Sequence, residues 1–162
     1  MARNASLRPA PRPEQVAACL RAAGLSVTAP RVAILGALQG ACDHPSPEVL
    51  HGRLRRVRPD LSLGTVYKAL HAFAEAGLVH EVSVAGENSR RFDANLDEHH
   101  HLVCTQCHEV RDLYDPQLDR VPLPRLATGF AAQRLMVHVL GRCPACTRTR
   151  PASRRRRGAR RA

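Results

Sequence analysis

The sequence has 162 residues, enough for one domain or for two small ones that share support from a metal ion or a partner. Aromatic residues make up only 3% of it and Trp is absent, so the core must consist of Leu, Val and Ala side chains. The formal net charge is +11, and no apolar run follows the basic N-terminus or approaches the ~20 residues of a membrane span, so we expect neither a secretory signal nor a membrane protein.

The N-terminal part of the chain predicts helices after a short disordered segment. Residues 1–12 are expected to be disordered. Pro13 begins a first helix that ends near Gly24, because proline is favoured in the first turn and glycine just past the last. Thr28 is a suitable cap for a second helix, which ends near Gly40.

A third and a fourth helix are indicated by clear start signals. Ser46-Pro47-Glu48 combines a capping side chain, a proline in the first turn and an acid at the positive end of the helix. Ser62 caps the fourth helix, which Gly77 ends. The residues expected to face the core are Leu50, Leu54 and Val57 of the third helix and Val66, Leu70 and Phe73 of the fourth.

A two-stranded hairpin is expected after the fourth helix. Val82 and Val84 alternate with polar residues, a turn is expected at 86–88, and a second strand at 89–92. Helices followed by a hairpin predict a winged helix-turn-helix DNA-binding domain over residues 13–93, with the fourth helix in the major groove and the hairpin as its wing. The candidate DNA contacts are Tyr67 and Lys68 on the helix and Arg90 and Arg91 in the wing. The alternatives are a partly buried aromatic at Tyr67 and an ordinary solvated charge at Lys68.

Residues 94–97 are expected to form a hinge to a second region, 98–147, whose main features are two Cys-x-x-Cys pairs. Four thiolates complete the tetrahedral shell that Zn²⁺ prefers and leave no open position, so we predict a structural zinc site. Its ligands are Cys104, Cys107, Cys143 and Cys146. The alternative is a pair of redox dithiols or disulfides. Because no secretory signal is expected, we place the protein in the cytoplasm, where paired cysteines more often bind metal.

The same region is expected to hold strands at 101–103, 110–113 and 134–140, and a short helix at 115–121 that Pro122 and Pro124 limit. The fold class is therefore α+β: an N-terminal winged helix-turn-helix domain followed by a small α/β dimerisation domain with a four-cysteine zinc site. Residues 148–162 contain eight Arg and no acid, and they read as a disordered tail. Such a tail either attracts phosphates without sequence preference or is simply solvated.

Three consecutive histidines, His99 to His101, precede the first cysteine pair, and imidazoles beside carboxylates suit iron, manganese, zinc or nickel. The winged helix, the hinge, His-x-His-x-x-Cys-x-x-Cys and the distal Cys-x-x-Cys together resemble the ferric uptake regulator (Fur) family over about residues 15–147. The match includes Gly24–Arg31 and Thr65–Tyr67, which adds Arg31 and Thr65 to the candidate DNA contacts. The resemblance implies a homodimeric, metal-responsive repressor that dimerises through residues 98–147 and reads a palindromic operator in double-stranded DNA.

The resemblance also implies a regulatory metal site between the two domains, suited to Fe²⁺ or Mn²⁺. Its ligands in this sequence would be His44, Asp93, His99, His101 and Asp112. Asp at both carboxylate positions is similar to the peroxide-sensing PerR branch of the family. In that branch Fe²⁺ reacts with hydrogen peroxide, a ligand imidazole (here His44 or His99) is oxidised, and DNA is released. A further metal site of the family is expected to be absent or weak, because Leu135 and His100 stand at its usual ligand positions.

Three other functions remain open from the sequence. An iron-, manganese- or zinc-responsive uptake regulator would use the same ligands, which do not choose among these metals. A zinc-dependent hydrolase would use the histidines and Asp93, but no Glu is placed as a general base beside the histidine run. A zinc-stabilised interaction module without DNA binding is disfavoured by Thr65–Tyr67, the hairpin and the positive charge. We therefore expect a regulator and not an enzyme.

Overall fold

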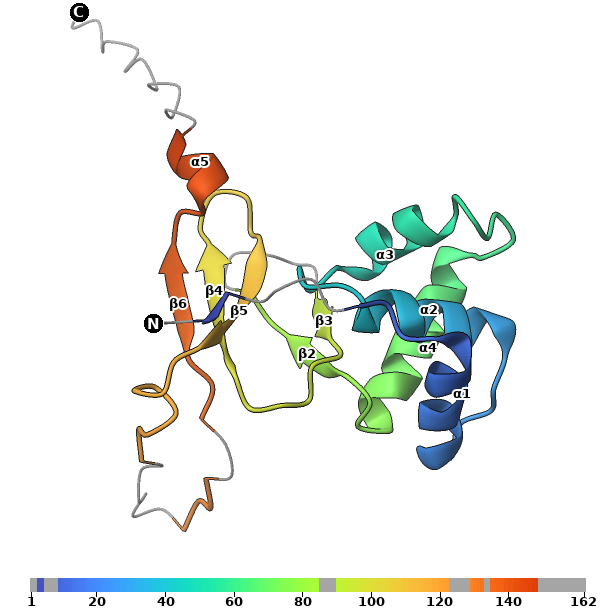
Figure 1. The fold of residues 1–162 in the computed structure, drawn as a ribbon, viewed down its shortest axis with the longest axis horizontal. Coiled ribbons are helices and arrows are strands. Elements are labelled where there is room, and N and C mark those ends of the chain that lie inside the picture. The colour runs from blue at the N-terminus through green and yellow to red at the C-terminus, as the bar shows by residue number, and fades with distance from the viewer. Residues whose placement is uncertain (1–2, 5–8, 85–89, 123–128, 133–134, 149–162) are drawn as a thin grey trace, which may run out of the picture.

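The structure, a computed structural model, describes residues 3–4, 9–84, 90–122, 129–132 and 135–148 (Figure 1). Four helices gather on one side of the molecule and a four-stranded sheet on the other, with a strand pair between them. This arrangement confirms the α+β fold class. No helix among the described residues is long and apolar enough to cross a membrane.

The helices of the N-terminal half begin where their capping residues predict. They are α1 (Pro13–Ala22), α2 (Ala29–Gln39), α3 (Pro47–Leu54) and α4 (Leu63–Glu75). Thr28, Ser46 and Ser62 each accept a hydrogen bond through the side-chain oxygen from the backbone N–H three residues later. Each bond satisfies one of the backbone donors that a helix N-terminus leaves without a partner.

One apolar core lies between these helices. It includes Leu20, Leu35, Leu50, Leu70 and Phe73, all fully buried. Val66, Leu70 and Phe73 of α4 point inward, as their spacing predicts. The prediction that Val57 is buried was wrong. Its side chain is 74% exposed, because α3 ends at Leu54 and Val57 lies in the turn that follows.

The hairpin between the helices and the sheet consists of β2 (His80–Val82) and β3 (Arg91–Asp93), paired antiparallel so that Val82 faces Arg91. The turn expected at 86–88 lies outside the described residues. Val82 and Val84 are buried in a cluster with Val103 and Val110 of the sheet. The hairpin therefore packs on the second half of the molecule as well as following α4.

The sheet has the strand order β1-β5-β4-β6. Its strands are β1 (Arg3–Asn4), β4 (His100–Cys104), β5 (Val110–Tyr114) and β6 (His138–Gly141). β4 pairs antiparallel with β5 and parallel with β6, so His101 lies between Asp112 and His138. A short helix, α5 (Pro144–Arg148), follows β6.

Two expectations for this half differ from the structure. The helix expected at 115–121 is a hydrogen-bonded turn: the N–H groups of Leu118 and Asp119 both donate to Asp115 O, and Pro122 prevents continuation. Within residues 1–12, Arg3–Asn4 form β1, because the edge of β5 offers unpaired backbone groups to a passing chain. The arginine tail after Arg148 lies outside the described residues, and the other predicted domain boundaries stay predictions.

Candidate metal centres and DNA-binding surface

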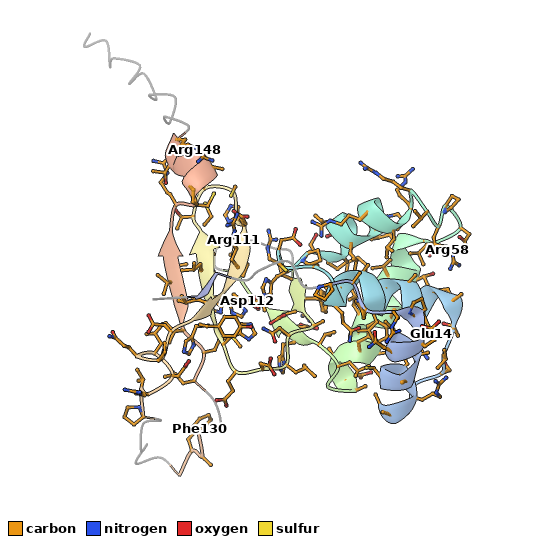
Figure 2. All side chains as sticks on the ribbon, viewed as in Figure 1. Glu14, Arg58, Arg111, Asp112, Phe130 and Arg148 are labelled. Atoms are coloured by element: carbon orange, nitrogen blue, oxygen red, sulfur yellow. The ribbon has the colours of Figure 1, made fainter. Side chains whose placement is uncertain are left out.

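Three histidines and two aspartates meet where the helical half approaches the sheet, near Asp112 in Figure 2. We call His44, Asp93, His99, His101 and Asp112 the interdomain cluster. His44 follows α2, Asp93 ends β3, His99 precedes β4, and His101 and Asp112 face each other across β4 and β5. All five side chains are buried. The structure thus brings together every residue predicted for this site.

The donor atoms of the interdomain cluster converge. His99 Nε2 lies 2.9 Å from Asp93 Oδ2 and 3.1 Å from His101 Nε2. His44 Nε2 lies 3.0 Å from Asp112 Oδ1 and 3.5 Å from Asp93 Oδ2. Donor atoms of His44, Asp93, His99 and His101 all lie within 4.8 Å of one another. Asp112 joins this group through its contact with His44.

The hydrogen bonding of the cluster fits a metal ion. Among the described residues, His44 Nδ1 and His101 Nδ1 are buried without a hydrogen-bond partner. A buried polar atom left unsatisfied costs about 1–3 kcal/mol, so such a group of atoms is stable only if something else satisfies them. Imidazole nitrogens and carboxylate oxygens are donors that first-row divalent metals accept.

The two carboxylates strongly perturb the imidazole of His44. Burial by itself lowers the pKa of His44, but hydrogen bonds to Asp112 and Asp93 outweigh this effect and raise the pKa to about 9. Burial opposes ionisation of Asp93, yet the imidazoles of His101, His44 and His99 hold the pKa of that carboxyl well below its usual range. Burial opposes ionisation of Asp112 as well, but the hydrogen bond with His44 lowers its pKa, so both aspartates present anionic oxygen donors at neutral pH.

Neighbouring groups orient these donors. His99 Nδ1 lies 2.7 Å from Asp97 O, so that nitrogen carries the proton and Nε2 is free to face the cluster. Asn95, which sequence reasoning missed, touches both carboxylates: its N–H donates to Asp93 Oδ1 at 2.7 Å and its Nδ2 to Asp112 Oδ2 at 2.8 Å. Asp93 accepts from the backbone N–H two residues later, as aspartates commonly do in turns, and any residue at position 95 can supply that N–H, so the sequence does not single out Asn95.

The four cysteines of the two Cys-x-x-Cys pairs form a second cluster, which we call the cysteine cluster. Their sulfurs all lie within 4.8 Å of one another, and Cys107 Sγ is 3.7 Å from Cys143 Sγ. Zn–S bonds of about 2.3 Å in a tetrahedron place two sulfurs about 3.8 Å apart, so the spacing fits a zinc ion. The structure has no disulfide among Cys19, Cys42 and the four cysteines of this cluster.

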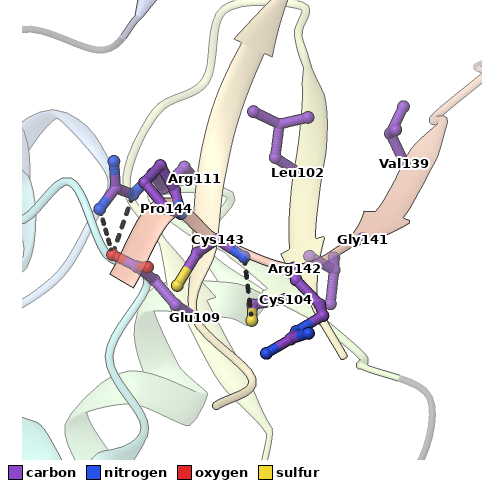
Figure 3. A pocket seen from close by; sticks show the side chains of 10 residues that line it. Leu102, Cys104, Glu109, Arg111, Val139, Gly141, Arg142, Cys143 and Pro144 are labelled. Atoms are coloured by element: carbon purple, nitrogen blue, oxygen red, sulfur yellow. Dashed lines mark hydrogen bonds and ion pairs between the residues drawn. The ribbon is translucent and has the colours of Figure 1, made fainter. Parts of the chain in front are cut away.

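Backbone groups favour the thiolate form of Cys104, whereas the contact with Cys107 raises the pKa of Cys146 to about 12. Hydrogen bonds from the backbone N–H groups of Cys107 and Cys143 lower the pKa of Cys104 to about 6. Figure 3 shows the second of these, at 3.3 Å, beside a cavity of about 200 Å³ that Leu102 and Val139 also line. His108, directly after the first pair, has a φ of 58°, which lets its N–H donate to Cys104 O at 2.9 Å and close the knuckle.

The predicted DNA contacts lie on three elements, which are α2, α4 and the hairpin. Tyr67 and Lys68 are exposed on α4, and Thr65 is half-buried near its N-terminus. Arg31, at the start of α2, donates to Ser26 O at 3.1 Å.

The two arginines of the wing have different surroundings. Arg90 is exposed and donates to Glu81 Oε2 at 2.8 Å. Arg91 is half-buried and donates to His44 O at 3.3 Å, so its guanidinium lies against the interdomain cluster.

Comparison with known proteins decides the family. A profile of the "Ferric uptake regulator family" matches residues 22–139. The chain belongs to the ferric uptake regulator (Fur) family. Members of the Fur family are metal-responsive repressors that bind DNA, and this protein is one of them.

Two curated relatives within the Fur family are similar over most of the chain. The "Peroxide-responsive repressor PerR" of Staphylococcus epidermidis is 34% identical over 134 residues, which covers 82% of this chain and 89% of the relative. PerR of Staphylococcus aureus strain Mu50 is 34% identical over the same share of this chain and 90% of its own.

Solved Fur structures share the fold. The Vibrio cholerae ferric uptake regulator has a TM-score of 0.64 and 30% identity, covering 78% of this chain and 98% of its own. The Pseudomonas aeruginosa regulator, solved with manganese, has a TM-score of 0.61 and 32% identity, covering 80% and 98%.

Proposed function

We propose that this protein is a homodimeric, cytoplasmic, PerR-like sensor that represses its target genes until hydrogen peroxide oxidises an imidazole of the interdomain cluster. The observation that carries this proposal is the buried cluster with aspartate at both carboxylate positions. The 34% identity to PerR over 82% of the chain supports it. Each molecule would react once, so the protein is a regulator and not an enzyme.

The two clusters would hold different metals for different purposes. The cysteine cluster binds Zn²⁺, whose closed shell of four thiolates leaves no position for a substrate and stabilises the small sheet domain. The interdomain cluster binds Fe²⁺ or Mn²⁺ through its three imidazoles and two carboxylates. The similar Pseudomonas aeruginosa regulator was solved with manganese, which accepts the same donors.

Metal binding at the interdomain cluster would fix the two domains relative to each other. His44 and Asp93 belong to the winged helix, and His99, His101 and Asp112 to the sheet domain. Only one arrangement of the domains lets all five donate to a single ion. A ligand that binds one arrangement better than the others raises its population. In a dimer, this fixes the spacing between the two recognition helices, which must match half-sites on one face of the duplex.

Peroxide would reverse this arrangement through the imidazoles. When bound, Fe²⁺ supplies the chemistry that cleaves peroxide beside the rings of His44 and His99. One peroxide oxygen would enter a ring C–H bond and the other would leave as water. This would change the donor strength of that imidazole, so the remaining donors would hold the domains less tightly. The dimer then loses the spacing that the operator requires. Mn²⁺ does not support this chemistry, so the manganese form would be insensitive to peroxide.

DNA binding is proposed to use α4 and nearby cations. Thr65, Tyr67 and Lys68 of α4 would meet base edges and phosphates in the major groove. Arg31, Arg90 and Arg91 would meet phosphates, which position the protein without reading sequence. Arg91 would share its guanidinium between a phosphate and the carbonyl of His44.

A metal-uptake regulator is the second candidate. The fold match to the regulators of Vibrio cholerae and Pseudomonas aeruginosa, at 30% and 32% identity, favours it as well. In that role, iron, manganese or zinc would close the same interdomain cluster, and peroxide would have no part.

The deciding experiment compares two metal forms of the protein prepared without oxygen. Binding to the protein's own promoter is measured for the Fe²⁺ and Mn²⁺ forms, before and after stoichiometric peroxide, and any added oxygen is mapped by mass spectrometry. We expect only the iron form to release DNA, with oxygen on His44 or His99. If both forms keep their DNA, the sensor proposal fails, and titration with each metal then tests the uptake regulator.

A further inference from the structure

One short segment touches both the interdomain cluster and the recognition helix. His44 contributes its imidazole to the cluster, and Glu48, four residues later, accepts a hydrogen bond through Oε1 from the hydroxyl of Tyr67. Tyr67 lies on the outer face of α4, with 47% of its surface exposed, and is a candidate DNA contact. Residues 43–48 thus contain a proposed metal ligand, His44, and contact a proposed DNA-binding residue, Tyr67, through Glu48.

Side-chain hydrogen bonds connect this segment rigidly to α3. Ser46 Oγ donates to Glu48 Oε2 at 2.7 Å and accepts from the backbone N–H of Val49. Arg53, in the last turn of α3, donates to both carboxylate oxygens of Asp43 and reaches Oδ1 at 3.0 Å. Asp43 and Glu48 therefore move with α3, and His44 lies between them in the chain.

The same segment is also held from the hairpin. Arg91 Nη1 donates to His44 O, and the backbone N–H of Phe92 donates to Pro45 O, both at 3.3 Å. His44 itself has a φ of 46°, a conformation that non-glycine residues adopt only where their surroundings fix it. A change in the position of the His44 imidazole is therefore passed to the backbone at the start of α3.

The carboxylate of Glu48 lies close to the proposed DNA-binding helix, where a negative charge is unfavourable for binding DNA. A free carboxylate beside a DNA-binding helix repels phosphates. Both oxygens of Glu48 accept hydrogen bonds, one from Tyr67 and one from Ser46, and the carboxylate keeps its charge. Its effect is to fix the Tyr67 hydroxyl, and with it the ring, relative to α3.

We propose that Glu48 is a positioning residue that holds Tyr67 in its DNA-reading orientation and makes that orientation depend on metal at His44. This inference rests on the proposed function, because it requires metal at the interdomain cluster and DNA at α4. A claim of coupling between two sites needs evidence from paired substitutions, since proximity alone does not establish it.

The test is a double-mutant cycle on the full-length protein. Affinity for DNA from the protein's own promoter is measured with and without Mn²⁺, which is insensitive to peroxide, for wild type, Glu48→Ala, Tyr67→Phe and the double variant. We expect Glu48→Ala to weaken binding of the Mn²⁺ form about threefold to tenfold, the size of one hydrogen bond. In the Tyr67→Phe background the same change should have no further effect. Glu48→Gln should bind at least as tightly as wild type, because its amide oxygen accepts the bond from Tyr67 and a charge that repels phosphates is removed.

Two controls separate positioning from other effects. Glu75→Ala removes an exposed carboxylate from α4 itself, one that faces His71 at 3.3 Å and not Tyr67, so it reports the effect of charge alone. Mn²⁺ affinity without DNA should be the same for Glu48→Ala and wild type, because Glu48 is not a ligand.

Each other outcome overturns a defined part of the inference. An equal loss from Glu48→Ala in the wild-type and Tyr67→Phe backgrounds overturns the positioning of Tyr67. The positioning is also overturned if Glu48→Ala binds DNA as tightly as Glu75→Ala, because removal of a carboxylate by itself only relieves repulsion of phosphates. An equal loss with and without Mn²⁺ overturns the link to His44. Wild-type protein that binds its promoter in neither state overturns the proposed function, and this inference with it.

Discussion

His44 is the residue at which protons and metal compete most directly. Its imidazole is buried between Asp93 and Asp112, which raise its pKa to about 9 against the pull of burial. At neutral pH the metal-free protein therefore keeps this ring protonated, and the cation pairs with two anions. A metal ion needs the neutral ring, so its binding releases this proton and strengthens as pH rises.

The sign of this linkage gives a first prediction. The folded pKa of about 9 lies above the ordinary value of 6.5, so His44 stabilises the metal-free protein fully below pH 6.5, and this stabilisation is lost as pH rises to about 9. We expect the Tm of metal-free protein to fall over this window, measured by calorimetry, and the Tm of the Mn²⁺ form not to fall. His44→Gln should flatten the metal-free curve. A metal-free Tm that rises between these pH values would contradict the assignment.

Asn95 gives the second prediction at this scale. Its side chain holds Asp112 Oδ2 while its backbone N–H holds Asp93 Oδ1, so it orients one carboxylate from each half of the molecule. Partners that orient metal ligands typically contribute a factor of about 10 to 100 in metal affinity. We expect Asn95→Ala to weaken Mn²⁺ binding by about tenfold in calorimetric titration. Leu96→Ala, at an exposed neighbour in the same hinge, is the matched control, and equal effects of the two changes would argue against this role.

At the scale of elements, the helices follow from the sequence more closely than the β half does. Thr28, Ser46 and Ser62 cap helices where their types predict, because a cap and its partner lie three residues apart. The strand Arg3–Asn4 was not predicted, because it depends on pairing with β5, which is distant in the chain. The turn at 115–121 was predicted as a helix, because the sequence shows where a helix can begin more clearly than whether it continues.

The candidate site residues likewise differ in how far the sequence predicts them. The cysteine pairs were visible as motifs, and the five members of the interdomain cluster through a family resemblance. Asn95 was not, because its contact with Asp112 spans 17 positions and leaves no local pattern.

The sheet domain has a small apolar core, and the cysteine cluster adds a second source of stability. Its buried apolar cluster consists of Val103 and Val110 with Val82 and Val84 of the hairpin, a small core for a domain of this size. The cysteine cluster joins the end of β4 and the turn after it to Cys143, just before α5, and to Cys146 within α5. We infer that zinc at these four sulfurs replaces part of the stabilisation that a larger core would give.

Removal of one sulfur tests this dependence. Cys143→Ser should lower the zinc content from one ion per chain to none in native mass spectrometry, and should lower the Tm of the whole protein. Cys19→Ser, at a partly buried thiol that packs against the helical core, should keep the zinc. A Cys143→Ser variant that retains both its zinc and its Tm would show that the cysteine cluster is not a structural metal site.

At the scale of the whole molecule, the two halves contact each other through one apolar cluster and one cluster of buried polar side chains. The valine cluster packs the hairpin on the sheet without regard to any ligand, whereas the interdomain cluster brings buried charges together beside it. The apolar contact keeps the halves close, and the polar contact makes their exact arrangement depend on what satisfies the buried donors. This combination suits a protein whose DNA affinity is set by domain orientation.

The charge of the chain gives the last prediction at this scale. Of the net charge of +11, seven arginines without any acid lie within residues 149–162. Cations that contact phosphates release counterions from DNA, so the logarithm of the affinity falls with the logarithm of salt concentration, by about 0.9 for each contact. We expect deletion of residues 149–162 to weaken binding to unrelated DNA and to reduce this slope by several units. The ratio of operator to unrelated DNA binding should rise, because recognition of bases by α4 is left unchanged. An unaltered slope would mean that these arginines remain solvated in the complex, and that the winged helix alone carries the electrostatic attraction to DNA.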